Sequence, residues 1–175
     1  MPQIVVGVAD CKISGAPGEV LATYALGSCI GLMVHDPVTS IGGLLHFMLP
    51  DSGIDPSRGR DNPYMFADTG IPLLISRVCG LGASKHRLIV HAVGGAQMMD
   101  QQCVFEIGKR NYFAMRRILW KAGVLIRGEV VGGTSSRTVR LEIGSGRLWL
   151  KEAGTQRELF PASPQKGADA WPIVS

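Results

Sequence analysis

Long hydrophobic runs, a leader segment and paired cysteines are all missing from this sequence, and each absence excludes a class of protein. No apolar stretch approaches the ~18–20 residues that a membrane-spanning helix requires. Residues 1–6 lack the basic start and long apolar core of a signal peptide. The four cysteines (Cys11, Cys29, Cys79 and Cys103) form no C-x-x-C pair. We therefore expect a cytoplasmic protein whose cysteines are reduced thiols rather than disulfides.

The sequence also lacks the usual signatures of metal, nucleotide and nucleic-acid binding. Its four histidines are not grouped with the cysteines at ligand spacing, so we expect no metal ion and no cofactor. Gly94-Gly95 and Gly132-Gly133 belong to neither a P-loop nor a G-x-G-x-x-G motif. The formal charge of +4 favours acidic partners mildly, but the basic residues are scattered without interleaved aromatics. Any catalysis must then come from protein side chains alone.

What the sequence does contain suits a compact globular protein. Hydrophobic residues make up 46% of the chain and charged residues only 18%, which argues against disorder. The 23 glycines and 10 prolines imply many turns and hence several short strands. From Glu152 onward the chain is rich in Pro, Gly, Ser and Ala. We expect a single domain over residues 1–151 and a poorly ordered C-terminal tail over 152–175.

Hydrophobic periodicity predicts an α/β or α+β domain, a layered sandwich with a mostly antiparallel sheet and about two helices. Strands are expected at 3–9, 19–26, 29–35, 41–49, 87–93, 124–131, 138–143 and 148–151. Helices are expected at 65–81, with Asn62 as N-cap, and at 109–122. Gly70 and Pro72 within the first helix predict a kink or a later start. Residues 51–63 read as a polar loop.

One predicted hairpin brings together two side chains that could carry chemistry. The strands at 29–35 and 41–49 flank Asp36-Pro37-Val38-Thr39, a turn signal with Pro at its second position. A turn centred between Pro37 and Val38 sets Cys29 opposite His46, with Cβ atoms about 4.5–5.5 Å apart. A register slip of two residues leaves them diagonal neighbours at about 7–8 Å. Either register suits a nucleophilic thiol with an imidazole base.

The same residues also allow other interpretations. Cys29 could be an ordinary buried cysteine and His46 a core polar group with its hydrogen bonds satisfied. Residues 27–31 fit a G-x-C-x-G version of the nucleophile elbow, but that motif requires a helix directly after the nucleophile. Gly27 and Ser28 would still let backbone N–H groups approach a substrate carbonyl as an oxyanion hole. For an enzyme using this pair, we expect the rate to rise through about pH 6–8, because His46 must be neutral.

Five blocks of sequence, in order, resemble the CheD family of chemoreceptor glutamine deamidases in bacterial chemotaxis. They are Thr23-Tyr24-Ala25-Leu26-Gly27-Ser28-Cys29, Gly43-Leu44-Leu45-His46-Phe47-Met48-Leu49-Pro50, Val93-Gly94-Gly95-Ala96-Gln97-Met98, Ile107-Gly108-Lys109-Arg110-Asn111, and Gly132-Gly133 with Arg137 and the Gly144–Gly146 turn. The resemblance spans roughly residues 3–151. Two positions depart from it: Ala25 stands where a family glycine is expected, and Pro72 interrupts a helix that is usually continuous.

The resemblance implies a protein-glutamine glutaminase, with Cys29 as nucleophile, His46 as general base and Thr23 as the third polar member of the site. It implies a layered α/β sandwich related to the catalytic domain of deamidating toxins. Its substrates would be glutamines on the helical cytoplasmic hairpin of methyl-accepting chemoreceptors, and a CheC-type phosphatase would be a second partner. The alternatives are another thiol hydrolase or acyltransferase, or a non-catalytic adaptor that binds receptor and phosphatase.

Overall fold

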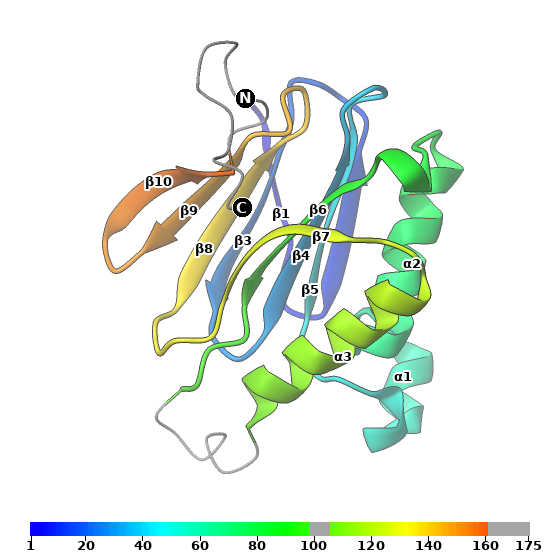
Figure 1. Ribbon diagram of the computed structural model, residues 1–175, viewed down its shortest axis with the longest axis vertical. Helices are drawn as coiled ribbons and strands as arrows, with labels where there is room; N and C mark the ends of the chain where they lie inside the picture. The colour runs from blue at the N-terminus through cyan, green and yellow to red at the C-terminus, as the bar shows by residue number, and fades with distance from the viewer. Residues whose placement is uncertain (99–105, 161–175) are drawn as a thin grey trace, which may run out of the picture.

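The protein folds into three layers: two β-sheets face to face, with helices covering the free face of one of them (Figure 1). The structure, a computed structural model, describes residues 1–98 and 106–160. We call the uncovered sheet sheet A and the helix-covered sheet sheet B. The predicted class, an α+β sandwich, is therefore confirmed.

The strands divide equally between the sheets. Sheet A contains, in spatial order, β1 (Gln3–Val5), β3 (Val20–Leu26), β8 (Arg137–Glu142), β9 (Leu148–Glu152) and β10 (Thr155–Leu159). Sheet B contains β2 (Asp10–Ser14), β5 (Ile41–Phe47), β4 (Ile30–Asp36), β6 (Ile89–Gly94) and β7 (Ile126–Val131). The β1–β3 and β6–β7 pairs are parallel and the others are antiparallel, in agreement with the prediction of a mostly antiparallel sheet.

The helices are α1 (Pro56–Asp61), α2 (Ala67–Gly80) and α3 (Ile107–Lys121), with short 3-10 turns at Ser52–Ile54, Pro63–Met65 and Lys85–Arg87. The expectation of about two helices holds for α2 and α3, while α1 lies in the stretch predicted to be a loop. Asn62 caps the 3-10 turn at Pro63, so α2 begins only at Ala67. Pro72 lies inside α2.

Two hydrophobic cores follow from alternation along the strands. Leu45 and Phe47 of β5 pack with α2 and α3 on one side of sheet B, whereas Leu44 packs between the two sheets. Because side chains alternate across a strand, His46 faces the same side as Leu44. The imidazole therefore points into the space between the sheets and away from the helices.

The β4–β5 hairpin has the predicted strands but a different register. Asp36 pairs with Ile41, so the loop is Pro37–Ser40 and the turn is centred one residue later than expected. The Asp36 carboxylate accepts a hydrogen bond from Val38 N, and its carbonyl accepts one from Ser40 N. Moving the centre by one residue shifts the pairing by two, so His46 lies opposite Gly31 rather than Cys29.

Two strands were not predicted from the sequence. Asp10–Ser14 forms β2, whereas the N-terminal strand ends at Val5. Thr155–Leu159 forms β10, which pairs along β9, so the prediction of an unstructured tail from residue 152 is wrong for this stretch. Phe160, which follows β10, stacks on His91 of β6 with ring centroids 4.8 Å apart. The remainder of that predicted tail, 161–175, lies outside the described residues.

Candidate active site

The candidate site lies between the sheets, at the end of the β4–β5 hairpin opposite its turn. Cys29 directly precedes β4, and His46 is the penultimate residue of β5. Because Gly31 lies opposite His46, Cys29 is its diagonal neighbour on the same face. Cys29 is half-buried and packs at the edge of the core between the sheets, while His46 is buried. The hairpin therefore presents a thiol and an imidazole to one side, as either predicted register requires.

Thr23 of β3 reaches across from sheet A to His46. Its hydroxyl oxygen lies 2.8 Å from Nδ1 of His46 and 2.7 Å from the carbonyl oxygen of Val6. A carbonyl can only accept, so the single hydroxyl hydrogen is donated to Val6. Nδ1 of His46 must then carry a hydrogen and donate it to Thr23. This tautomer leaves Nε2 as an unprotonated base, and Nε2 is buried without a hydrogen-bond partner among the described residues.

Burial keeps both members of the pair neutral at rest. It lowers the pKa of His46 to about 4, against the opposing effect of the negative charge on Asp10. Burial likewise raises the pKa of the Cys29 thiol, an effect reduced by a hydrogen bond from its own backbone.

The backbone around Cys29 is held by the end of β6. Gly95 N donates to the carbonyl of Cys29, and Ala96 N donates to the carbonyl of Gly27, both at 2.9 Å. Gly94 has a φ of +124°, and a Cβ there would overlap the Cys29 carbonyl oxygen. Glycine is thus required at Gly94 for the close approach of two backbones. Gly27 likewise lies directly against the Met98 side chain.

Sequence reasoning missed two contributors near the pair. Asp10 of β2 lies opposite His46 in the β2–β5 ladder. Asn111 of α3 contacts the segment that carries Cys29, with Nδ2 3.0 Å from the carbonyl oxygen of Ser28. Asp10 was hidden because β2 was not predicted. Asn111 stands within one of the resembling sequence blocks, but its spacing from Cys29 indicates no contact.

The other described cysteines do not share these surroundings. Cys11 is buried, and burial raises the pKa of its thiol to about 11, which makes it a poor nucleophile. Cys79 is half-buried on α2. Cys103 lies outside the described residues. Within residues 1–98 and 106–160, no three His, Cys, Asp or Glu side chains are grouped to hold a metal ion.

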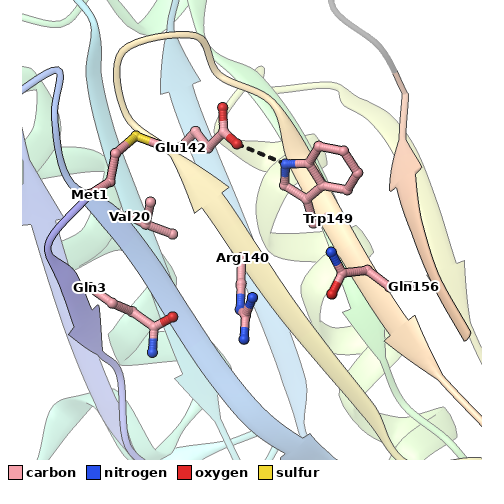
Figure 2. A pocket seen from close by; sticks show the side chains of 7 residues that line it. All are labelled: Met1, Gln3, Val20, Arg140, Glu142, Trp149 and Gln156. Atoms are coloured by element: carbon pink, nitrogen blue, oxygen red, sulfur yellow. Dashed lines mark hydrogen bonds between the residues drawn. The ribbon is translucent and has the colours of Figure 1, made fainter. Parts of the chain in front are cut away.

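A hollow of about 300 Å³ lies elsewhere, on the outer face of sheet A (Figure 2). Gln3, Arg140, Trp149 and Gln156 line it, from strands β1, β8, β9 and β10. Its lining includes neither Cys29 nor His46, which face the opposite side of that sheet. The hollow is therefore separate from the candidate active site. No helix in the described parts of the chain is long and apolar enough to cross a membrane.

Comparison with known proteins identifies close relatives. The CheD family model, described as CheD chemotactic sensory transduction, matches residues 48–152, a segment that begins after His46. A Solibacter usitatus (strain Ellin6076) protein named probable chemoreceptor glutamine deamidase CheD is 70% identical over 169 residues, covering 97% of this chain and 100% of that protein. A Syntrophus aciditrophicus (strain SB) protein named probable chemoreceptor glutamine deamidase CheD 1 is 46% identical over 154 residues, covering 88% and 96%.

Among solved structures, a Neisseria meningitidis protein matches with a TM-score of 0.46 and 10% identity, covering 76% of this chain and 63% of that one.

Proposed function

Because this chain belongs to the CheD family, we propose that it hydrolyses the side-chain amide of specific chemoreceptor glutamines to glutamate and releases ammonia. The observation that carries the proposal is the arrangement of Thr23, His46 and Cys29 between the sheets. A hydrogen bond fixes the imidazole tautomer and leaves Nε2 without a partner among the described residues, and the thiol lies on the same face of the hairpin. This arrangement has the parts that amide hydrolysis through a thioester requires.

In the first half of the reaction, Cys29 is the nucleophile and His46 the base. Nε2 takes the thiol proton as sulfur bonds to the carboxamide carbon, and the carbonyl oxygen becomes an oxyanion. Backbone N–H groups of the Gly27-Ser28-Cys29 segment hold this oxyanion. The segment is suited to this role because the backbone after β6 binds the carbonyls of Gly27 and Cys29 and so keeps it in place. His46 then gives its proton to the nitrogen as the carbon–nitrogen bond breaks, so ammonia leaves and a thioester remains.

In the second half, water replaces ammonia. His46 removes a proton from water, the resulting oxygen attacks the thioester carbon, and the carbon–sulfur bond breaks. The proton on Nε2 returns to sulfur, which regenerates the neutral pair. Thr23 holds the Nδ1–H throughout, so the same nitrogen acts in both halves. Each turnover converts a neutral receptor side chain into a carboxylate.

The partners follow from the substrate. Receptor glutamines of this class lie on a cytoplasmic helical hairpin, so we place the protein in the cytoplasm. A phosphatase of the CheC type is a proposed second partner, supported by the family resemblance. Gel filtration of the two purified proteins, alone and mixed, tests that complex.

The deciding experiment incubates the full chain with a purified receptor cytoplasmic fragment and maps peptides by mass spectrometry. We expect amide-to-acid conversion at particular glutamines, with equal ammonia release and no cleavage or cross-linking. Cys29→Ser, which keeps the size of the side chain, should show neither product. Cross-linked or cleaved products would indicate another thiol enzyme. Stable binding of the fragment without any conversion would indicate an adaptor.

A further inference from the structure

Three consecutive carbonyl groups of the nucleophile segment are each held by a different donor. Ala96 N binds the carbonyl of Gly27, and Gly95 N binds that of Cys29. Between them, the carbonyl of Ser28 accepts a hydrogen bond from the side chain of Asn111. Two of the three donors are backbone groups that follow β6, and the third comes from α3. Asn111 therefore provides a hydrogen bond that this backbone loop does not make.

The same amide nitrogen makes a second contact, next to the base. Asn111 Nδ2 lies 3.0 Å from the carbonyl oxygen of Ser28 and 2.8 Å from that of Met48. Since carbonyl oxygens only accept, the amide must present its NH₂ group to both, which determines its orientation. Ser28 immediately precedes Cys29, and Met48 follows His46 by two residues. One amide thus joins the segment bearing the nucleophile to the end of the strand bearing the base.

The surroundings of Asn111 make this link rigid. The residue is fully buried on α3, and its Oδ1 has no hydrogen-bond partner within the described parts of the chain. One turn earlier, Gly108 lies so close to Gly95 and Ala96 that a Cβ there would be 2.6 Å from both carbonyl oxygens. The start of α3 is therefore packed directly on the loop that holds Cys29. A nonpolar side chain at this position would not donate to the carbonyls of Ser28 and Met48, so packing alone does not account for a buried amide with an unpaired oxygen.

We infer that Asn111 is a positioning residue for the deamidation, fixing the distance between Cys29 and His46 by binding the carbonyl groups of Ser28 and Met48 with one amide. The inference rests on the proposed roles of Cys29 and His46. Cys29 itself precedes β4 and is held to the chain after β6 through its carbonyl, whereas His46 is held within β5 and by Thr23. Hairpin pairing links their neighbours Ile30 and Phe47, and the Asn111 amide adds a second link beyond that pair.

The test compares Asn111→Asp and Asn111→Ser with a matched control on the same helix. Asp keeps the shape of Asn but replaces the NH₂ with an acceptor, and Ser is too short to reach both carbonyls. Met115→Ala is the control, because Met115 lies on α3 and is buried in the core, so its truncation lowers stability without removing either hydrogen bond. The full chain is used, with melting temperature, kcat, KM and the alkylation rate of Cys29 by iodoacetamide measured for each variant.

We expect both Asn111 variants to lower kcat by about 100-fold while KM changes less than about twofold, because misplacement of reacting groups affects the chemical step. Alkylation of Cys29 should slow about tenfold as its base moves away. Met115→Ala should retain both kcat and the rate of Cys29 alkylation, even if its melting temperature falls as far as those of the Asn111 variants. Unchanged rates in the Asn111 variants, or equal losses in Met115→Ala at equal stability, would overturn the inference.

Alkylation separates this inference from the proposed function. If the unaltered protein fails to deamidate any receptor fragment, the proposed function is wrong. The effect of Asn111 on Cys29 alkylation would still decide whether the amide positions the pair. Peptide mapping assigns the label to Cys29 rather than to Cys11, Cys79 or Cys103.

Discussion

Thr23 and His46 are joined by a hydrogen bond in which the ring, not the hydroxyl, is the donor. The hydroxyl hydrogen is already given to the carbonyl of Val6, so Nδ1–H of His46 donates to the Thr23 oxygen at 2.8 Å. A neutral acceptor thus takes the place that a carboxylate has in many catalytic triads. It selects the tautomer without adding a charge that would favour the imidazolium ion. Burial lowers the pKa of His46 to about 4, although the negative charge on Asp10 acts in the opposite direction.

Replacement of Thr23 should separate its hydrogen bond from its bulk. Thr23→Val preserves shape but removes both the acceptor for Nδ1–H and the donor to Val6. We expect a loss of kcat of about 10–100-fold, within the range of general-base contributions. Thr23→Ser keeps the hydroxyl and should stay within about fivefold of the unaltered protein. Steady-state ammonia release measures both, and a Val variant with full activity would remove Thr23 from the mechanism.

The pH dependence of the rate should reflect the buried imidazole. His46 acts as a base only when neutral, and burial lowers its pKa to about 4. Activity should therefore fall as pH drops through about 4 rather than through the pH 6–8 range expected from the sequence. His46→Ala should lose about 100-fold or more in rate at neutral pH. Rates from pH 3.5 to 9 on a stable receptor peptide measure the profile, and a midpoint near 6.5 would contradict a base that burial keeps neutral.

Stability should fall in acid because two buried histidines resist protonation. Burial lowers the pKa of His46 and His91 from 6.5 to about 4 in the folded state. Between these values the unfolded chain binds more protons, so the free energy of unfolding decreases as pH falls from about 6.5 to about 4. Each group contributes a loss of at most about 3 kcal/mol. Urea unfolding at pH 7 and 4.5 measures it, and His91→Phe, which can still stack on Phe160, should reduce the difference.

Replacing Ala25 with glycine, the residue that the family resemblance led us to expect there, should increase the stability of the protein. Its φ is +55°, in the left-handed region, at a register shift of the β3–β8 pair between Thr23 and Leu26. A Cβ costs about 1–2 kcal/mol in this conformation, and glycine relieves most of that. Ala25→Gly should raise the free energy of unfolding by about 0.5–1 kcal/mol after its greater unfolded-state entropy is counted. Ala22→Gly, on the same strand at an ordinary φ, should lower it.

The sequence predicted local features well where burial determines the pattern of apolar residues. Weak alternation or apolar runs located β3, β4, β5 and β8, and the amphipathic pattern located α3 within two residues. The hairpin brought Cys29 and His46 to one face even though its register was wrong, because an error of two residues preserves the face. Ser40, with a φ of +54°, belongs to the loop and lengthens the turn, which the Asp-Pro signal did not reveal.

The missing parts of the prediction depend on contacts distant in sequence. The segment Asp10–Ser14 forms a strand because β5 supplies its pairing partner, and this pairing places Asp10 next to His46. The hydrogen bond from Thr23 to Val6 determines which nitrogen of His46 is the base, yet no spacing links these three residues. Asn111 reaches Ser28 across 83 positions of the chain. Such contacts are created by the stacking of layers rather than by periodicity.

The pairing of β10 determines where the protein can be shortened without exposing a sheet edge. β10 pairs along the outer side of β9, Leu159 is buried between the sheets, and Phe160 covers His91 on the other sheet. Cutting the chain at residue 151 would leave β9 as an open edge with unpaired backbone groups, a common starting point for aggregation. Samples prepared for crystallisation or spectroscopy should therefore keep residues through 160, and purification tags should be attached beyond that point.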